Sequence, residues 1–409
     1  MREFAQALGH AALLLERSEF DAAEHEYARA VALKPSDPNA QFALAKLRYM
    51  RGDPQFARDL VAAATRDRND GLLELQFANV LRQTGDLPGA EILLRDLIAR
   101  AGPTPELRSS LAAVLHAAGR LREAEGEARA ALHGRPTDPT IAHNLVAVLL
   151  SLGRADEALP LIRAARALAP LDYSWIADEA IAARLLGDPA YGVLYDYERL
   201  VSVYDLEPPP GWGSMAEFNA ALEASLKHRH TLVRHPFDQS MRSGTQSMGN
   251  LVRDSAPAIQ AALEAFSEPI AEYRAMLGTA ADHPLSARNH GESCYAGCWS
   301  VQLQQHGFHV NHIHPEGWLS SAYYVAVPAE TADSSQQSGW IKFGEPALPV
   351  PGAKPELAVQ PKAGRLVLFP SYMWHGTTAL QQAERRLTMA FDVVTSVANS
   401  DPLQGTAQS

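Results

Sequence analysis

The chain has 409 residues, a formal net charge of −11 and 46 % hydrophobic residues. At roughly 150 residues per domain this length predicts two or three folded domains, and the negative charge argues against a nucleic-acid partner, which would require clustered lysine and arginine. Two cysteines, Cys294 and Cys298, cannot form a disulfide framework, and no apolar run is long enough to predict a membrane span, so we expect a cytoplasmic protein.

Glycines recur through the N-terminal half at intervals of 33 or 34 residues, which indicates an internal repeat. A small alanine, which would let two helices approach closely, stands five residues after each of these turn positions except the last. Glycine suits the turns, and prolines end some of the units. The turn positions are Ser18, Gly52, Gly85, Gly119, Gly153 and Gly187, the alanines are Ala23, Ala57, Ala90, Ala124 and Ala158, and the prolines are Pro35, Pro136 and Pro170.

Each unit therefore predicts two helices joined by a turn, and neighbouring units must stack because one helix pair cannot bury its apolar face. The period and the small and helix-breaking residues resemble those of tetratricopeptide (TPR) repeats, over about residues 1–190. This resemblance implies an α-solenoid whose groove binds a peptide or a protein partner. The alternative is a packing platform with no groove ligand, and a homodimer remains open.

A run of three prolines, Pro208 to Pro210, breaks the helical pattern. We expect a repeat array at 1–200, a linker at 201–214, a second domain at 215–396 and a flexible tail at 397–409. In the second domain, helical patterns give way to short alternating segments. Helices followed by antiparallel strands predict a double-sheet jelly roll, or double-stranded β-helix, with supporting helices. The expected helices are 215–227 and 247–278, and the expected strands are 298–305, 320–328, 339–343, 364–370 and 385–394.

Four of the 15 histidines fall within nine residues, and two of the four are separated by one residue. Side chains two apart on a strand point the same way, so His312 and His314 could share one metal ion. The third ligand must come from elsewhere, and His375 directly follows a strongly apolar strand. His306 and His309 are expected beside the metal or at the surface.

Further polar residues follow the same alternation on the later strands. Arg386 and Thr388 share a face of the last expected strand. Tyr324 shares a face with Ala322 and Ala326, which suggests that Tyr324 lines a pocket while its neighbour belongs to the core.

Taken together, HxH, YYV, LFPSYMWH and RRLTMAFD resemble the 2-oxoglutarate/Fe(II) oxygenase superfamily. The resemblance covers roughly 205–395 and is greatest to a bacterial branch in which TPR repeats precede the oxygenase, an order shared by aspartyl/asparaginyl β-hydroxylases. It implies Fe(II) held by His312 and His375, and 2-oxoglutarate held by Arg386 with Thr388 and Tyr324. It also implies that O₂ and 2-oxoglutarate are consumed in the hydroxylation of a substrate, which we expect to be a peptide or protein side chain presented by the repeats.

The middle metal ligand departs from the family pattern, because His314 stands where a carboxylate is usual. His314 could ligate directly, could abstain and leave two histidines with water, or could pair with Glu316 in a shifted frame. We favour His312, His314 and His375, a set that also suits zinc. The alternative function is a catalytically inactive metal-binding jelly roll in a TPR scaffold protein, although such a domain would have no need of Arg386.

Overall fold

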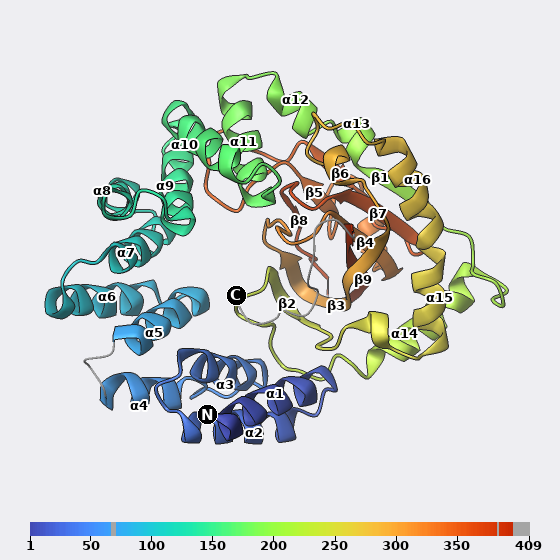
Figure 1. Cartoon of the computed structure of the whole chain (residues 1–409). Coiled ribbons are helices and arrows are strands. Elements are labelled where there is room, and N and C mark those ends of the chain that lie inside the picture. Colours follow the sequence, from blue (N-terminus) through green and yellow to red (C-terminus); the bar gives the residue numbers. More distant parts are fainter. Residues whose placement is uncertain (67–70, 383, 396–409) are drawn as a thin grey trace. The chain divides into compact units, whose positions relative to one another are not determined.

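Paired helices build the N-terminal unit of this computed structural model, which describes residues 1–66, 71–382 and 384–395 (Figure 1). The unit comprises Met1–Ile162 together with two short segments from farther along the chain, Leu232–Gln239 and Leu348–Pro351. Consecutive helices pack on one another, as stacked repeats require. The helices are α1 (Arg2–Glu16), α2 (Phe20–Leu33), α3 (Pro38–Met50), α4 (Arg58–Arg66), α5 (Gly71–Thr84), α6 (Leu87–Ala101), α7 (Pro105–Ala117), α8 (Leu121–Gly134), α9 (Pro139–Ser151) and α10 (Ala155–Leu168).

The repeat anchors adopt the conformations that the period predicts. All five turn glycines have a positive φ, from 66° at Gly187 to 92° at Gly85, and Ser18 has a φ of 60° one period earlier. The alanines at 23, 90, 124 and 158 are completely buried between helices. Ala57 differs, because it precedes α4 and is only half-buried. The predicted solenoid of TPR helix pairs is confirmed.

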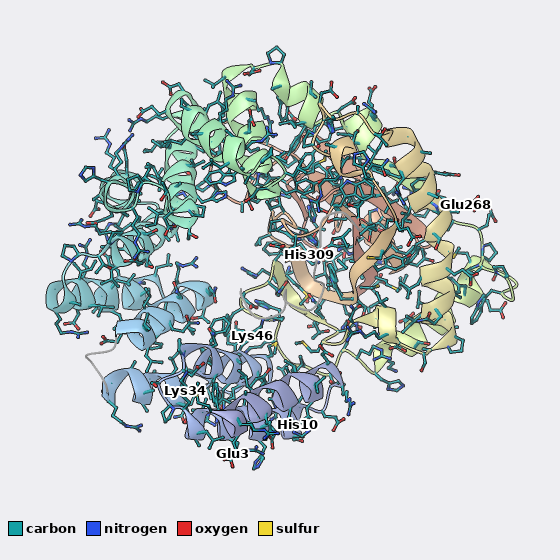
Figure 2. The ribbon with its side chains drawn as sticks, in the orientation of Figure 1. Glu3, His10, Lys34, Lys46, Glu268 and His309 are labelled. Atoms are coloured by element: carbon teal, nitrogen blue, oxygen red, sulfur yellow. The ribbon has the colours of Figure 1, made fainter. Side chains whose placement is uncertain are left out.

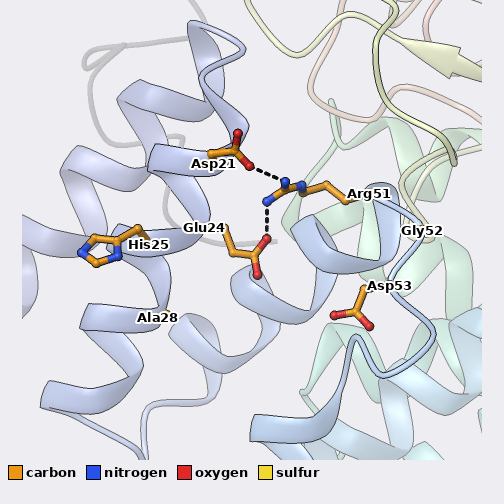
Figure 3. Close-up of a pocket in the computed structure, with 7 residues that line it drawn as sticks. All are labelled: Asp21, Glu24, His25, Ala28, Arg51, Gly52 and Asp53. Carbon is orange, nitrogen blue, oxygen red and sulfur yellow. Dashed lines mark hydrogen bonds and ion pairs between the residues drawn. The ribbon is translucent and has the colours of Figure 1, made fainter.

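Ion pairs beside the turns tie neighbouring helices together. Arg120 contacts Glu91 at 2.6 Å, and Arg154 contacts Glu125 at 2.7 Å one period later. Figure 3 shows a related contact at a surface hollow, where Arg51 bridges two carboxylates of α2. Partly exposed ion pairs of this kind each contribute about 0–1 kcal/mol to stability. We interpret the hollow as part of the packing between repeats, because Arg51 pairs with two of the carboxylates that line it.

The second unit begins at Arg163 and contains two antiparallel sheets, which confirms the predicted jelly-roll class. The larger sheet has the strand order β1-β7-β4-β9-β3-β2, and the smaller has the order β6-β5-β8. The strands are β1 (Ser202–Asp205), β2 (Met241–Gln246), β3 (Ser293–His309), β4 (Leu319–Ala326), β5 (Ile341–Phe343), β6 (Leu357–Val359), β7 (Arg365–Pro370), β8 (His375–Thr377) and β9 (Arg386–Thr395).

Helices cover one face of the larger sheet. The ring of Phe266 lies 5.0 Å from that of Phe391 on β9 and 5.1 Å from that of Tyr323 on β4, centroid to centroid. The Tyr323 hydroxyl donates to Asn219 at 2.7 Å, which places Tyr323 in the core as expected. The helices of this unit are α11 (Tyr173–Leu186), α12 (Ala190–Leu194), α13 (Tyr197–Leu200), α14 (Met215–Lys227), α15 (Pro257–Ala265) and α16 (Ser267–Leu277), with 3₁₀ turns at Leu251–Arg253, Ser286–Arg288 and Ala329–Ala332.

The boundary between the units differs from the expected linker at 201–214. Residues 202–205 form strand β1, which pairs with β7, and the Asp205 carboxylate lies 2.7 Å from the Arg365 guanidinium. Helix α11 also belongs to the second unit, because Tyr173 packs edge-to-face on Tyr372 at 5.1 Å. The tail expected at 397–409 lies outside the described residues. Within the described ranges, no helix has both the length and the apolarity that a membrane crossing needs.

Candidate metal centre

Three histidines converge where the end of β3 meets β8. The backbone N–H of His312 donates to the carbonyl of His375 at 2.8 Å, and the reverse bond measures 3.0 Å. A side chain at Gly376 would meet the His309 carbonyl at 2.9 Å, so glycine permits this close approach. The N–H of His314 donates to the Ser371 carbonyl at 2.9 Å. The potential ligand atoms of His312, His314 and His375 all lie within 4.8 Å of one another.

A fixed acceptor faces Nδ1 of each ring. Nδ1 of His312 lies 2.9 Å from the Val310 carbonyl, and Nδ1 of His375 lies 2.9 Å from the Met373 carbonyl. These acceptors require a proton on Nδ1, which leaves the lone pair on Nε2. Metal-binding histidines are commonly oriented by such hydrogen bonds from the opposite nitrogen.

Burial and mutual proximity keep two of the rings neutral. Burial, together with the neighbouring His314 ring, lowers the pKa of His312 to about 3. Burial, with His312 and His314 nearby, holds the pKa of His375 well below its ordinary value. Neutral imidazole is the form that binds metal ions, so both rings are ready to ligate at neutral pH without losing a proton.

Asp392 supports the third histidine, a role that the sequence analysis did not assign. Its carboxylate oxygens lie 2.7 and 2.9 Å from Nδ1 of His314, and Ser320 donates to the same carboxylate at 2.7 Å. Burial alone would lower the pKa of His314, but the Asp392 carboxylate outweighs it and the pKa is raised. The available signal was strand alternation, because Asp392 follows Arg386 and Thr388 on the same face of β9.

Other residues adjoin the three rings without completing the ligand set. The Ser240 hydroxyl lies 3.3 Å from Nε2 of His312 and 3.0 Å from Nδ1 of His309, a contact absent from the sequence analysis. His309, labelled in Figure 2, is therefore beside the centre rather than at the surface. His306 and Glu316 are exposed, and neither belongs to the histidine cluster. The shifted frame that pairs His314 with Glu316 thus has no geometric support.

The predicted 2-oxoglutarate residues lie on adjacent strands of the larger sheet. Arg386 is only 3 % exposed, and its guanidinium carbon lies 5.6 Å from the Tyr324 ring centroid. One of its terminal nitrogens donates to the Gly339 carbonyl. The Thr388 hydroxyl donates to the Val301 carbonyl at 3.4 Å rather than to Arg386, and Thr388 is the cross-strand partner of Tyr324. The structure thus places all three residues on one face of neighbouring strands.

Residues 297–392, which span this whole constellation, match the family model described as "Putative 2OG-Fe(II) oxygenase". Residues 8–71 and 75–139 match the tetratricopeptide repeat model. The chain joins tetratricopeptide repeats to a domain of the 2OG-Fe(II) oxygenase family. No curated protein matches the chain.

Solved structures resemble parts of the chain. A thermophilic TPR protein of Thermus thermophilus is 25 % identical, with 44 % of this chain and 99 % of that one covered at a TM-score of 0.36. A TPR protein of Parabacteroides merdae is 12 % identical, covering 48 % and 79 % at a TM-score of 0.37. A Pseudomonas putida prolyl-4-hydroxylase is 16 % identical, covering 50 % and 98 % at a TM-score of 0.33.

The donor groups of the oxygenase domain fit the cofactors that its family implies. Three imidazole nitrogens suit Fe(II), as they also suit zinc, copper and nickel. Two buried polar atoms, Nε of Arg386 and the hydroxyl of Tyr324, have no hydrogen-bond partner among the described residues. A carboxylate ligand would give this buried guanidinium the anionic partner that a buried charge requires.

Replacing Asp392 tests whether its carboxylate orients the His314 ring for metal binding. We expect Asp392→Asn to weaken Co(II) binding about 10- to 100-fold, because the group that orients a ligating histidine and increases its basicity is altered. Isothermal titration of the full-length chain measures the affinity. Glu316→Gln is the matched control, since it neutralises an exposed carboxylate near the same histidine. Equal losses in the two variants would restore the pairing of His314 with Glu316.

Proposed function

We propose that the C-terminal domain is a Fe(II)- and 2-oxoglutarate-dependent dioxygenase that hydroxylates a peptide or protein side chain. The family match and the three-histidine cluster support an oxygenase. The TPR array supports a polypeptide substrate, because such repeats stack into surfaces that commonly bind other chains.

The observation that carries this proposal is the buried guanidinium of Arg386. Burial lowers its pKa, and its contacts are a hydrogen bond to the Gly339 carbonyl and the ring of Tyr324. A site for a metal alone would not require a buried cation on the same face of the sheet. A dicarboxylate that chelates a metal at one end and reaches Arg386 with the other would use both features.

Each residue of the candidate site has a distinct role in this proposal. His312, His314 and His375 would hold Fe(II) through Nε2, and Arg386 would bind the distal carboxylate of 2-oxoglutarate with the Tyr324 hydroxyl as a second donor. Asp392 would hold the Nδ1 proton of His314 and so fix the direction of its lone pair. Fe(II) with bound 2-oxoglutarate would supply the oxidising chemistry, in which O₂ is consumed and succinate and CO₂ are released.

Anaerobic titration tests the proposal most directly. The metal-free chain is titrated with Fe(II) and then with 2-oxoglutarate, while the visible absorption is followed. We expect a weak charge-transfer band that depends on both components, and succinate once O₂ is admitted. Metal binding that is indifferent to 2-oxoglutarate would contradict the oxygenase and leave a metal-binding jelly roll in a TPR scaffold.

The middle ligand has its own test in His314→Asp. If His314 ligates, an aspartate at this position restores the two-histidine, one-carboxylate set common in this chemistry. We then expect Fe(II) binding to persist within about tenfold, whereas His314→Ala should weaken it about 100-fold, a loss of roughly 3 kcal/mol. Equal Fe(II) affinity for His314→Ala and the wild type would show that His314 abstains.

A further inference from the structure

A short segment of irregular backbone, Leu232–Gln239, packs within the repeat unit although it lies far along the chain from the repeat helices. It forms neither helix nor strand. Leu232, Pro236 and Phe237 are buried, whereas Val233 is 71 % exposed. The segment therefore contacts the repeats through a few side chains, as a bound peptide does, rather than as an element of secondary structure.

Phe237 of this segment joins a buried apolar cluster that includes Leu60 and Leu73, and its aromatic and charged neighbours stand on one face of α3. Phe42, Lys46 and Tyr49 are separated by four and then three residues, a spacing that aligns them along one side of a helix. Phe237 packs edge-to-face on two of them, with ring centroids 5.4 Å from Phe42 and 5.2 Å from Tyr49. Its side chain is 3 % exposed. Aromatic pairs of this geometry contribute about 0.5–1.5 kcal/mol each beyond the burial of their area.

Polar contacts set the direction of the segment. The Asp238 carboxylate pairs with the ammonium of Lys46, which Figure 2 labels on α3. The backbone N–H groups of Val233 and Arg234 both donate to the Met50 carbonyl at 3.0 Å, at the end of the same helix. This face of α3 thus contacts an aromatic residue followed directly by a carboxylate, with two backbone N–H donors a few residues before them.

We propose that Phe237 and Asp238 are an internal ligand of the repeat array, and that the same face of α3 binds a partner protein segment in which an acidic residue follows an aromatic one. The tether gives the internal ligand an effective concentration in roughly the millimolar range, so the partner segment must compete against it. None of these residues belongs to the candidate metal or 2-oxoglutarate groups. The inference therefore goes beyond the proposed function and does not depend on it.

A labelled peptide with the sequence of residues 231–241 tests the internal ligand. It is titrated into the full-length chain, and fluorescence anisotropy gives the affinity without metal or 2-oxoglutarate. We expect the double variant Phe237→Ala, Asp238→Ala to bind the peptide at least tenfold more tightly than the wild type, because the internal competitor has been removed. Equal affinities, or no binding by a double variant that keeps the wild-type circular dichroism spectrum, would overturn the proposal.

If the double variant does not fold, reversing the charges of Asp238 and Lys46 provides a second test. In the chain carrying only Asp238→Lys, the internal ion pair is lost but Phe237 remains, and the peptide should again bind at least tenfold more tightly than to the wild type. Adding Lys46→Glu forms the internal ion pair again with reversed charges, so it should remove this gain, and a peptide with lysine in place of its aspartate should then bind no more tightly than the native peptide binds the wild type. Lys34→Glu, the same change at a lysine that pairs with Asp37, should leave binding unchanged. Retention of the tenfold gain after Lys46→Glu is added would refute the proposed recognition.

Discussion

Replacing His375 with alanine should abolish stoichiometric Fe(II) binding. Structural zinc sites with four protein ligands are worth roughly 10–16 kcal/mol, or about 3 kcal/mol or more for each ligand, so loss of His375 should lower the Fe(II) affinity more than about 100-fold. The loss should be this large because a two-way backbone bridge holds His375 opposite His312, and the ring of His375 supplies one of the three converging nitrogens. Anaerobic equilibrium dialysis against Fe(II) measures the effect, and succinate formation should disappear with it.

His306→Asn is the matched control for this experiment. His306 is an exposed histidine of the same cluster in the sequence, and asparagine tolerates its φ of 59°. Fe(II) affinity in this variant should equal that of the wild type. Retained stoichiometric binding in His375→Ala would remove His375 from the ligand set and with it the proposed centre.

Replacing Arg386 with methionine should separate 2-oxoglutarate binding from metal binding. Losing one partner of a buried charge pair costs roughly 2–5 kcal/mol, so the KM for 2-oxoglutarate should rise about 30-fold or more while Fe(II) affinity is retained. In the absence of 2-oxoglutarate the variant should be at least as stable as the wild type. Methionine fills similar space, and it removes a buried charge that has no carboxylate partner in the described chain.

Arg385→Met provides the comparison, because Arg385 is the exposed neighbour and pairs with Glu223. Its KM should stay within about twofold of the wild type, as expected for an exposed pair. Thermal unfolding with and without 2-oxoglutarate gives a second readout: the ligand should raise the melting temperature of the wild type and of Arg385→Met only. A normal KM in Arg386→Met would assign the carboxylate to another residue.

The features that the sequence could predict are those with a local period. The 33- or 34-residue spacing located the turns that have a positive φ, from Gly52 to Gly187, and strand alternation placed Arg386 and Thr388 on one face of the last strand. The spacing of His312 and His314 and the apolar strand before His375 singled out these three residues, which the structure brings together. Their roles in catalysis remain predictions.

The features that escaped prediction depend on contacts between distant parts of the chain. Asp392 meets His314 only because β9 lies beside β4, an order that no local pattern encodes. The sequence did not predict strand β1, because its four residues directly precede the proline run that suggested a linker. Phe237 sits in a polar loop, so its burial against Phe42 could not be anticipated from its neighbours in the sequence.

Strand β9 has a consequence for how the protein is made. It lies between β4 and β3 and is hydrogen-bonded to both, yet it is the last strand of the sheet to leave the ribosome. Until then, β3 and β4 each expose an unpaired edge, the kind of edge that promotes aggregation of nascent chains. The TPR helices contact mainly their neighbours in the chain and can stack during synthesis. We therefore expect the repeats to fold first, and chaperones that shield strand edges to act on the oxygenase domain late in translation.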